Sequence, residues 1–588
     1  MSGITGILSM SKELTPQTTL QAMTDIIQHR GPDGEGHFLA PQVALGYRHF
    51  DVHGLTAEQA QTLQHLNRYV VTFDGRIYNL PELQAELCEH GYAFDCASDA
   101  ALLAAAYDHW GVDCLNKLNA DWAFVIYDTQ TKTFFIARDR FGIKPLYYYA
   151  DATCFIFASE IKSIHASGQV DKAPNEAYLQ AYLENGPNEY DAPTAFKDIV
   201  RFPFGHYFHG TLDQLLSSPH FTRYWELQVN VAREEFDPAK AQEYAQQYYD
   251  LLADAVRIRM RGKVKIGAAL SGGLDSSSIV YLMHQELQTQ DASEPLQTFS
   301  SVYKTPGTEH CDESEFINIV ADQLGVISNQ IEPKVEDIPV EHEKMIWAME
   351  SPPGNTLMSS WHSFKMINEK GFKISLEGQG ADEQLAGYPN FVVSYLLSLK
   401  AGSFLNELKS FEVSVKYKLL AIVLFLSRMT GTSKIAESLI ASQTKLKIFW
   451  NLNENLKYSL STDLPSNYGL DIPLSSCHQV ETAYPFVDIR LVEFLASVPS
   501  VYKMHKGWSK YLARLAFNKK LQDDINWRKD KMGWPIPEEQ WFNGPLKKWF
   551  EDKIAMTYNH AKPSFSQKVK FLNYEVFHEV FRMAKGDK

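Results

Sequence analysis

The feature that most constrains the fold is a glycine-rich segment, Ser271-Gly272-Gly273-Leu274-Asp275-Ser276-Ser277, between two regular elements. Residues 264–270 before it, apolar except for Lys265, are typical of a strand, and an amphipathic helical pattern follows it. Glycines permit a sharp turn, and free N–H groups at the start of a helix attract phosphate oxygens. Asp275 adds a carboxylate, a ligand that magnesium prefers. The pattern predicts a nucleotide-phosphate site; a tight turn with no ligand is the alternative.

The sequence around this loop alternates between helical and strand-like stretches. Residues 239–260 form an amphipathic helix pattern, and strand-like runs follow at 264–270, 298–303 and 373–376. Such alternation favours a doubly wound parallel sheet. Residues 400–460 are predicted to be helical. The GxxxxGK[ST] pattern is absent from the sequence, so the loop is not of the Walker type.

The first part of the chain has a different pattern, with short strand-like runs such as 69–73 and 122–127 and interleaved helices such as 81–90. We expect an α+β domain over residues 1–205. Polar residues then favour a connector at 206–240, and a second domain at 241–588.

Composition restricts the possible partners and location. The 588 residues carry a net charge of −15 without a basic tract, which argues against nucleic acid. Six scattered cysteines and the lack of a signal-peptide pattern favour a cytoplasmic protein without a zinc site. The apolar run 419–426 is too short to span a bilayer. We expect it to be a buried helix and expect no membrane partner; the alternative, contact with a membrane surface, rests on the flanking Lys416, Lys418 and Arg428.

Several further motifs share one order with a known family. They are Met1-Ser2-Gly3-Ile4-Thr5-Gly6-Ile7-Leu8, His29-Arg30-Gly31-Pro32-Asp33-Gly34, residues 137–147 and 158–162, Asp312-Glu313-Ser314, Gly380-Ala381-Asp382-Glu383, Pro485-Phe486-Val487-Asp488, Lys510-Tyr511-Leu512 and Lys531-Met532-Gly533-Trp534. Together with the glycine loop, which resembles the PP-loop of ATP pyrophosphatases, they make the chain resemble the asparagine synthetase family nearly end to end. The resemblance implies an Ntn-hydrolase-like, four-layer αββα class II glutamine amidotransferase domain. A PP-loop domain of the adenine nucleotide α-hydrolase type, a doubly wound parallel sheet with helical additions, would follow it.

The same resemblance implies ATP and Mg²⁺ as cofactors. It gives Asp275 and Asp382 as metal ligands, and a nucleotide pocket formed by Leu270, Ser271, Gly272, Gly273, Asp275, Ser276, Ser301 and Gly378. The family prefers valine at the position of Ser301. Lys510 and Lys531 would meet the pyrophosphate and the reacting acyl group, where fixed cations stabilise developing negative charge. Gln379 replaces a family glutamate and can orient an amine or carboxylate by hydrogen bonds, and Glu383 is a candidate proton relay.

The glutaminase pocket that the resemblance implies departs from the family. Ser2 stands where the family has its nucleophilic cysteine, and a hydroxyl needs a positioned base. His49 aligns with the arginine that holds the glutamine carboxylate. Asp74 and Arg76 replace the asparagine that stabilises the oxyanion and the glutamate that binds the ammonium, whereas Asp99 matches. We expect a degenerate pocket, filled by an Asp74–Arg76 ion-pair network. An engineered serine alone would not explain four departures.

These observations predict an ATP-dependent ligase that adenylates a carboxylate and joins it to an amine that does not come from glutamine. β-Lactam synthetase, carbapenam synthetase and lasso-peptide cyclases, relatives of the family, also lack the cysteine. The substrate would be a small molecule or peptide with a carboxylate and an amine, and the family leaves a homodimer open. The alternatives are an ammonia-dependent or nominally glutamine-hydrolysing asparagine synthetase and a catalytically silent binding or regulatory protein.

Overall fold

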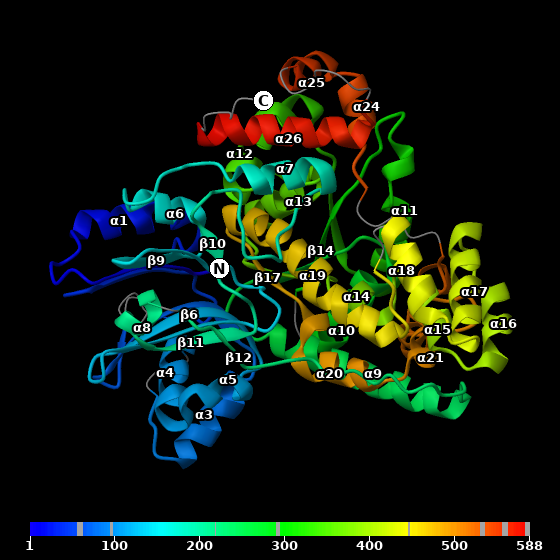
Figure 1. The fold of residues 1–588 in the computed structure, drawn as a ribbon, viewed down its shortest axis with the longest axis horizontal. Helices are drawn as coiled ribbons and strands as arrows, with labels where there is room; N and C mark the ends of the chain where they lie inside the picture. The colour runs from blue at the N-terminus through cyan, green and yellow to red at the C-terminus, as the bar shows by residue number, and fades with distance from the viewer. Residues whose placement is uncertain are drawn as a thin grey trace.

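The structure is a computed structural model that describes residues 1–55, 63–94, 98–217, 219–289, 294–444, 447–529, 535–555 and 563–582. Lys531 lies outside these described residues. Figure 1 shows a β-rich N-terminal half beside a larger, helix-rich C-terminal half.

Two antiparallel sheets make up the N-terminal half. The first has the order β10-β8-β9-β1-β3-β2 and the second the order β12-β11-β7-β6-β5-β4. Their bounds are β1 Gly3–Ser9, β2 Gly34–Ala40, β3 Val43–His49, β4 Gln64–His65, β5 Tyr69–Ile77, β6 Ala120–Asp128, β7 Thr133–Arg138, β8 Tyr147–Ala150, β9 Cys154–Ala158, β10 Val200–Arg201, β11 His206–Thr211 and β12 Thr222–Arg223. Apolar residues from both sheets, such as Leu45 and Val125, share one cluster, so the sheets pack face to face.

Helices cover the outer faces of these two sheets. Helices α1 (Gln17–Asp25) and α6 (Ile161–Ala166) contact strands of the first sheet, and α4 (Asp99–Trp110) contacts β5 of the second. Helices α3 (Leu80–Glu89) and α5 (Cys114–Lys117) join the same apolar cluster as α4. The half therefore has the four-layer αββα, Ntn-hydrolase-like architecture that the resemblance implied. The boundary at residue 205 stays a prediction, although β11 and β12 pair within the second sheet.

A parallel sheet of five strands organises the C-terminal half. Its order is β15-β14-β13-β16-β17, and every neighbouring pair is parallel. The strands are β13 Ile266–Ala269, β14 Gln297–Ser301, β15 Ile327–Ile331, β16 Ile374–Leu376 and β17 Glu481–Ala483. The strand order reverses between β13 and β16, and ligands bind at such a switch point, outside the carboxyl ends of the strands. The predicted doubly wound sheet is confirmed.

Helices make up the rest of the C-terminal half. They are α9 Pro238–Arg259, α10 Leu274–Thr289, α11 Ser314–Leu324, α12 Ile338–Met349, α13 Met358–Glu369, α14 Ala381–Leu385, α15 Phe391–Ser398, α16 Ala401–Ser410, α17 Val415–Met429, α18 Ser433–Thr444, α19 Leu452–Cys477, α20 Ile489–Ser497, α21 Ser500–Lys503, α22 Tyr511–Ala516, α23 Asp523–Asn526, α24 Glu538–Asn543, α25 Lys547–Ile554 and α26 Phe565–Phe581. The long α19 contains two prolines, Pro465 and Pro473. It runs from the outer helices α15–α18 back to β17.

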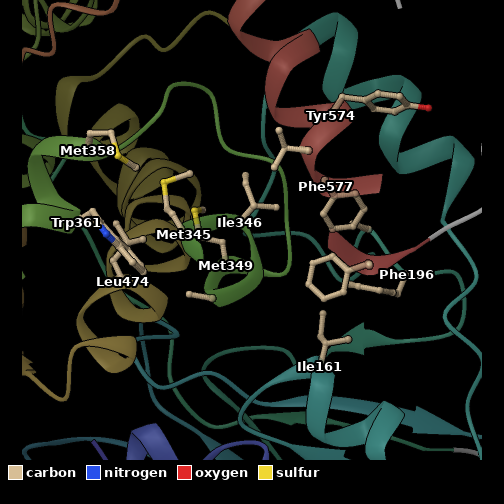
Figure 2. Packing of buried hydrophobic residues seen from close by; sticks show 14 of the residues in the cluster. Ile161, Phe196, Met345, Ile346, Met349, Met358, Trp361, Leu474, Tyr574 and Phe577 are labelled. Carbon is tan, nitrogen blue, oxygen red and sulfur yellow. The ribbon is translucent and has the colours of Figure 1, made fainter. Parts of the chain in front are cut away.

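The two halves share one hydrophobic core. Ile161 and Phe196 from the N-terminal half belong to the same buried cluster as Met345 and Trp361 from α12 and α13 (Figure 2). Phe577 of α26, near the end of the described chain, packs edge-on against Phe196. Because apolar burial is the main favourable term in folding, this joint core holds the halves in one arrangement.

The apolar run 419–426 does not form a buried helix, so that prediction is wrong. It lies in α17, whose Ala421 and Leu424 are buried, whereas Leu419, Val423 and Leu426 are more than half exposed. When a helix is apolar on all sides, its sequence does not show which side packs against other helices. Within the part of the chain that the structure describes, no helix has the length and apolarity needed to cross a membrane.

Candidate active site

The glycine loop lies where the sequence predicts it, between β13 and α10. Gly272 has φ +72°, and a Cβ there would lie 2.6 Å from Cβ of Phe316. The backbone therefore requires glycine at this position. Within the loop, the Ser271 N–H donates to Ser276 Oγ at 3.2 Å, and the Gly273 N–H donates to Ser271 Oγ at 3.4 Å. These hydrogen bonds hold the loop folded at the start of α10.

Two carboxylates and one lysine converge beside the loop. Lys510 Nζ lies 2.5 Å from Asp275 Oδ2 and 2.5 Å from Asp382 Oδ1, and the lysine is almost fully buried. Asp275 follows β13 and Asp382 follows β16, so the switch point of the sheet brings them together. Lys510 itself has φ +51°, a conformation that costs a non-glycine residue free energy and is common at functional sites.

The two carboxylates fit the predicted magnesium ion. Asp275 Oδ2 and Asp382 Oδ1 both lie 2.5 Å from the same atom, Lys510 Nζ, so one cation can contact both carboxylates. Hard oxygen donors of this kind are the ligands that Mg²⁺ takes. A Cβ at Gly387 would lie 1.7 Å from Asp382 Oδ1, so the backbone leaves room there only for that carboxylate. Asp275 and Asp382 would therefore hold the ion, and Lys510 could turn toward the phosphates.

A cavity of about 330 Å³ opens next to this cluster. Loop residues form one wall of it, and residues from α14 and α19 form another. Its lining is Ala269, Ser271, Asp275, Ser276, Leu357, Ser360, Glu377, Gly378, Gln379, Asp382, Glu383, Tyr388, Asn467, Leu470 and Asp471. The volume is at the lower end of the range for small-molecule sites.

Two further acids line the cavity, the half-buried Asp471 and the buried Glu377. Burial raises the pKa of Asp471 to about 7, and the hydrogen bond from Gln379 Nε2, at 2.5 Å, offsets only part of this effect. Burial likewise raises the pKa of Glu377 to about 8, with Ser375 Oγ donating to it at 2.6 Å. Neither residue forms an ion pair with a cation among the described residues. The sequence analysis missed Asp471, because a single aspartate inside a helix carries no signal.

Glu383 also lies in this wall. Burial and the neighbouring Asp382 raise the pKa of Glu383 to about 7. Tyr388 Oη donates to it at 3.0 Å and Asn467 Nδ2 at 3.2 Å. A carboxyl group that changes protonation near neutral pH suits the proton relay that the sequence analysis assigned to it.

The remaining predicted nucleotide residues are near the loop. Leu270 donates its backbone N–H to Phe299 O, and Gly378 follows β16 directly opposite Asp275. Ser301 ends β14, but its hydroxyl donates to Ser359 O at 2.8 Å. It does not line the cavity, so its contact with nucleotide stays a prediction.

The pocket beside Ser2, which the sequence analysis predicts to be a degenerate glutaminase pocket, is small. Ser2 Oγ accepts a hydrogen bond from the Phe50 N–H at 3.3 Å and lies 3.4 Å from Tyr47 Oη. Burial lowers the pKa of His49, which Tyr47 contacts at 2.6 Å, so the histidine is neutral at pH 7. The cavity beside Ser2 measures about 40 Å³, room for about one water molecule.

The partners of Asp74 and Arg76 differ from the expectation. Asp74 Oδ2 pairs with Arg30 at 2.8 Å, and both side chains are buried. Arg76 instead donates to the backbone oxygen of Arg259 at 3.2 Å. Asp74 therefore joins an ion-pair network, through Arg30 to Glu160, but the prediction that Arg76 is its partner is wrong. Asp99 accepts hydrogen bonds from the Ile77 N–H and from His53.

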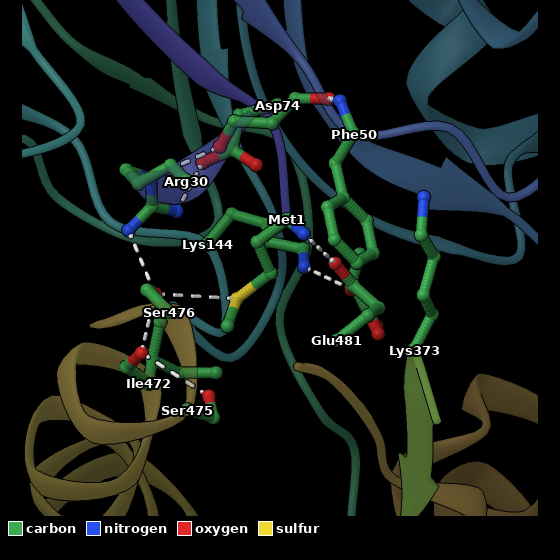
Figure 3. Close-up of polar contacts among 12 residues, drawn as sticks. Met1, Arg30, Phe50, Asp74, Lys144, Lys373, Ile472, Ser475, Ser476 and Glu481 are labelled. Carbon is green, nitrogen blue, oxygen red and sulfur yellow. Dashed lines mark hydrogen bonds and ion pairs between the residues drawn. The ribbon is translucent and has the colours of Figure 1, made fainter. Parts of the chain in front are cut away.

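Charged groups near Ser2 join the halves (Figure 3). Glu481 of β17 contacts the Met1 amine at 3.1 Å and pairs with Lys144. Burial lowers the pKa of the Met1 amine to about 5, so at pH 7 the amine donates a hydrogen bond and Lys144 supplies the positive charge. Arg30 Nη1 donates to Ser476 Oγ at 3.1 Å across the same boundary. Residues next to the pocket at Ser2 therefore contact β17 of the parallel sheet and helix α19.

Comparisons with known proteins identify the family of both halves. A family model described as asparagine synthase matches residues 247–588, and one described as a glutamine amidotransferase domain matches residues 1–225. The family match identifies an asparagine synthetase-like enzyme of the ATP-dependent amide-forming ligase class. The chain belongs to the asparagine synthase family.

Individual relatives cover most of the chain. The glutamine-hydrolysing asparagine synthetase 3 of Bacillus subtilis (strain 168) is 27% identical over 577 residues, 94% of this chain and 89% of the relative. The putative glutamine-hydrolysing asparagine synthetase 2 of Methanocaldococcus jannaschii is 28% identical, and the match covers 78% of this chain and 92% of the relative. Amidase chry2 of Gibberella zeae is 25% identical over 91% of this chain and 87% of the relative. A solved glutamine PRPP amidotransferase of B. subtilis matches with 16% identity and a TM-score of 0.28, covering 52% of this chain and 67% of that one.

Proposed function

We propose that the chain is an asparagine synthetase-like ligase that joins a substrate carboxylate to an amine from a source other than glutamine. A carboxylate oxygen attacks the α-phosphorus of ATP, and pyrophosphate leaves. The amine nitrogen then attacks the acyl carbon, and AMP leaves with the former carboxylate oxygen. The amine loses a proton, for which Glu383 is the candidate acceptor.

The observation that carries this proposal is the convergence of Asp275, Asp382 and Lys510 beside the cavity. Adenylation concentrates negative charge on the phosphates, and a buried cation held in place stabilises it without reorganisation. When bound, Mg²⁺ would neutralise part of the same charge. The buried Lys510, positioned by its backbone conformation, can contact the phosphates or the acyl group. The predicted role of Lys531, which lies outside the described residues, stays a prediction.

Asp471 and Glu377, which line the cavity, support an amine-bearing substrate. Removal from water raises the pKa of both carboxyl groups, so their ionisation is unfavourable without a cation. A substrate ammonium group would supply that cation, and Gln379, which donates to Asp471, would orient it. An acid and an amine bound in one cavity gain a large effective concentration. This supports a lactam, macrolactam or other amide as the product, in specialised metabolism.

The closed pocket at Ser2 supports a nitrogen source other than glutamine. A cavity of about 40 Å³ is far below the volume of the smallest ordinary ligand sites. Asp74 also places a carboxylate where the family stabilises an oxyanion, and Arg30 already neutralises it. The N-terminal half then serves as a scaffold.

ATP–pyrophosphate exchange with a panel of carboxylic and amino acids tests this function. We expect exchange with at least one acid, and its loss in Asp275→Asn but not in Asp524→Asn, an exposed aspartate of α23. No exchange with any acid would favour the silent regulatory protein. Asparagine from aspartate, ATP and ammonium would favour the ammonia-dependent synthetase, which the names of the B. subtilis relatives make the main rival.

A further inference from the structure

Helix α17 has an apolar face that no described residue covers. Val415, Leu419, Val423, Leu426 and Met429 are between 53% and 71% exposed. At 3.6 residues per turn they lie on one side of the helix, opposite the buried Ala421 and Leu424. A surface helix normally turns polar residues to water, so a helix that is apolar on both faces indicates a second apolar neighbour.

The next helix extends this face. Helix α18 contacts α17, and its Ile435 and Leu439, one turn apart, are 64% and 58% exposed. Figure 1 shows α16, α17 and α18 at the edge of the molecule, away from the sheets. We call the seven exposed apolar residues of α17 and α18 the outer apolar face.

The charge around the outer apolar face is opposite to that of the whole chain. Between residues 412 and 447 the sequence has six basic and two acidic residues, although the net charge of the chain is −15. One of the six, Arg428, points inward and donates to Leu397 O at 2.6 Å. Lys416 and the half-exposed Lys418 lie on either side of the apolar stripe of α17, and Lys434 is exposed on α18. Of the two acidic residues, Glu437 accepts a hydrogen bond from Trp450 at 3.1 Å, and Glu412 lies 3.7 Å from Lys529.

We propose that the outer apolar face docks on an anionic lipid surface. Apolar side chains flanked by lysines are the features with which amphipathic helices lie in the headgroup region of a membrane. A protein partner of ordinary composition would not require the basic border, whereas anionic headgroups complement it. The helices lie on the membrane and do not cross it.

Co-sedimentation of the full chain with vesicles tests the proposal. We expect binding to vesicles of phosphatidylglycerol and phosphatidylcholine, weaker binding in high salt, and much weaker binding to phosphatidylcholine alone. The double variant Leu419→Asp/Leu426→Asp should lower the affinity at least about tenfold. Each of Lys416→Gln, Lys418→Gln and Lys434→Gln should lower it about fivefold on anionic vesicles.

A matched control has the same substitutions at other exposed apolar positions. Leu14 and Val340 are 58% and 59% exposed and lie outside the outer apolar face. The variant Leu14→Asp/Val340→Asp should bind vesicles as the unchanged protein does. The proposal fails if the unchanged protein does not bind anionic vesicles at low salt, or if both double variants behave alike. It also fails if light scattering shows a dimer that only Leu419→Asp/Leu426→Asp makes monomeric, because a second copy then covers the face.

Discussion

The buried ion pair between Glu481 and Lys144 gives the sharpest prediction about how the halves are joined. Both side chains are almost fully buried, and the pair links the N-terminal half to β17 of the parallel sheet. In Glu481→Gln the shape is kept but the negative charge is lost. Lys144 is then left as an uncompensated cation, and the Met1 amine loses a charged acceptor.

Two routes give the size of the effect. Burial alone would raise the pKa of Glu481, but Lys144 and, to a lesser extent, the Met1 amine outweigh it and lower the pKa from 4.5 to about 2. Since one pKa unit is about 1.4 kcal/mol, the carboxylate contributes about 3 kcal/mol at pH 7. Breaking a buried pair by removing one partner costs about 3–5 kcal/mol, in agreement. Because the pKa is lowered on folding, this contribution is complete above pH 4.5 and is lost as the pH falls toward 2.

Urea unfolding followed by tryptophan fluorescence measures this loss. We expect Glu481→Gln to lower the free energy of unfolding by about 3 kcal/mol at pH 7, and by much less near pH 3. Glu226→Gln is the control, because Glu226 contacts Lys457 at 2.8 Å in an exposed position, and exposed pairs contribute little. Equal unfolding midpoints for the two variants would refute the reasoning.

Three further predictions concern the sites. Lys510→Met should lower ATP–pyrophosphate exchange by about 10²–10³-fold, because it removes the buried cation, whereas Lys506→Met, at an exposed position, should not; equal rates would exclude Lys510 from the chemistry. Ser2→Cys should not release glutamate from glutamine, because the cavity stays at about 40 Å³; glutamate release by this variant would show that only the nucleophile is missing. Burial raises the pKa of Glu377 from 4.5 to about 8, so its ionisation destabilises the fold as the pH rises across that range. Urea midpoints should therefore rise for Glu377→Gln relative to the unchanged protein between about pH 5 and about pH 9, and a pH-independent difference would contradict this reading.

The sequence predicts the centre of the site well, because local patterns determine it. The apolar run, the glycines and the helical pattern specify a strand, a turn and a helix within about 25 residues, and β13 and α10 follow them. Local pattern alone does not show that Asp382 and Lys510 meet Asp275. The family resemblance predicts this meeting, and the strand order at the switch point is its physical reason.

Other features depend on which elements become neighbours. In the sequence, nothing distinguishes Asp471 from other polar residues of a helix. It lines the cavity only because α19 packs there. Asp74 and Arg76 suggested a pair because they lie close in sequence, yet Arg30 reaches Asp74 from another segment. The sequence predicts that residues 419–426 are helical, and they lie in α17. Which of their side chains are exposed depends on the helices that pack against α17, and the sequence does not show this.

The most direct test of the central claim measures AMP and glutamate in the same reaction. The purified chain would receive ATP, Mg²⁺, glutamine and an acid that supports pyrophosphate exchange, with and without a panel of amines. We predict AMP and an amide product that depend on the added amine, with no glutamate above the level of a protein-free sample. Glutamate formed in step with AMP, in the absence of an added amine, would contradict the account.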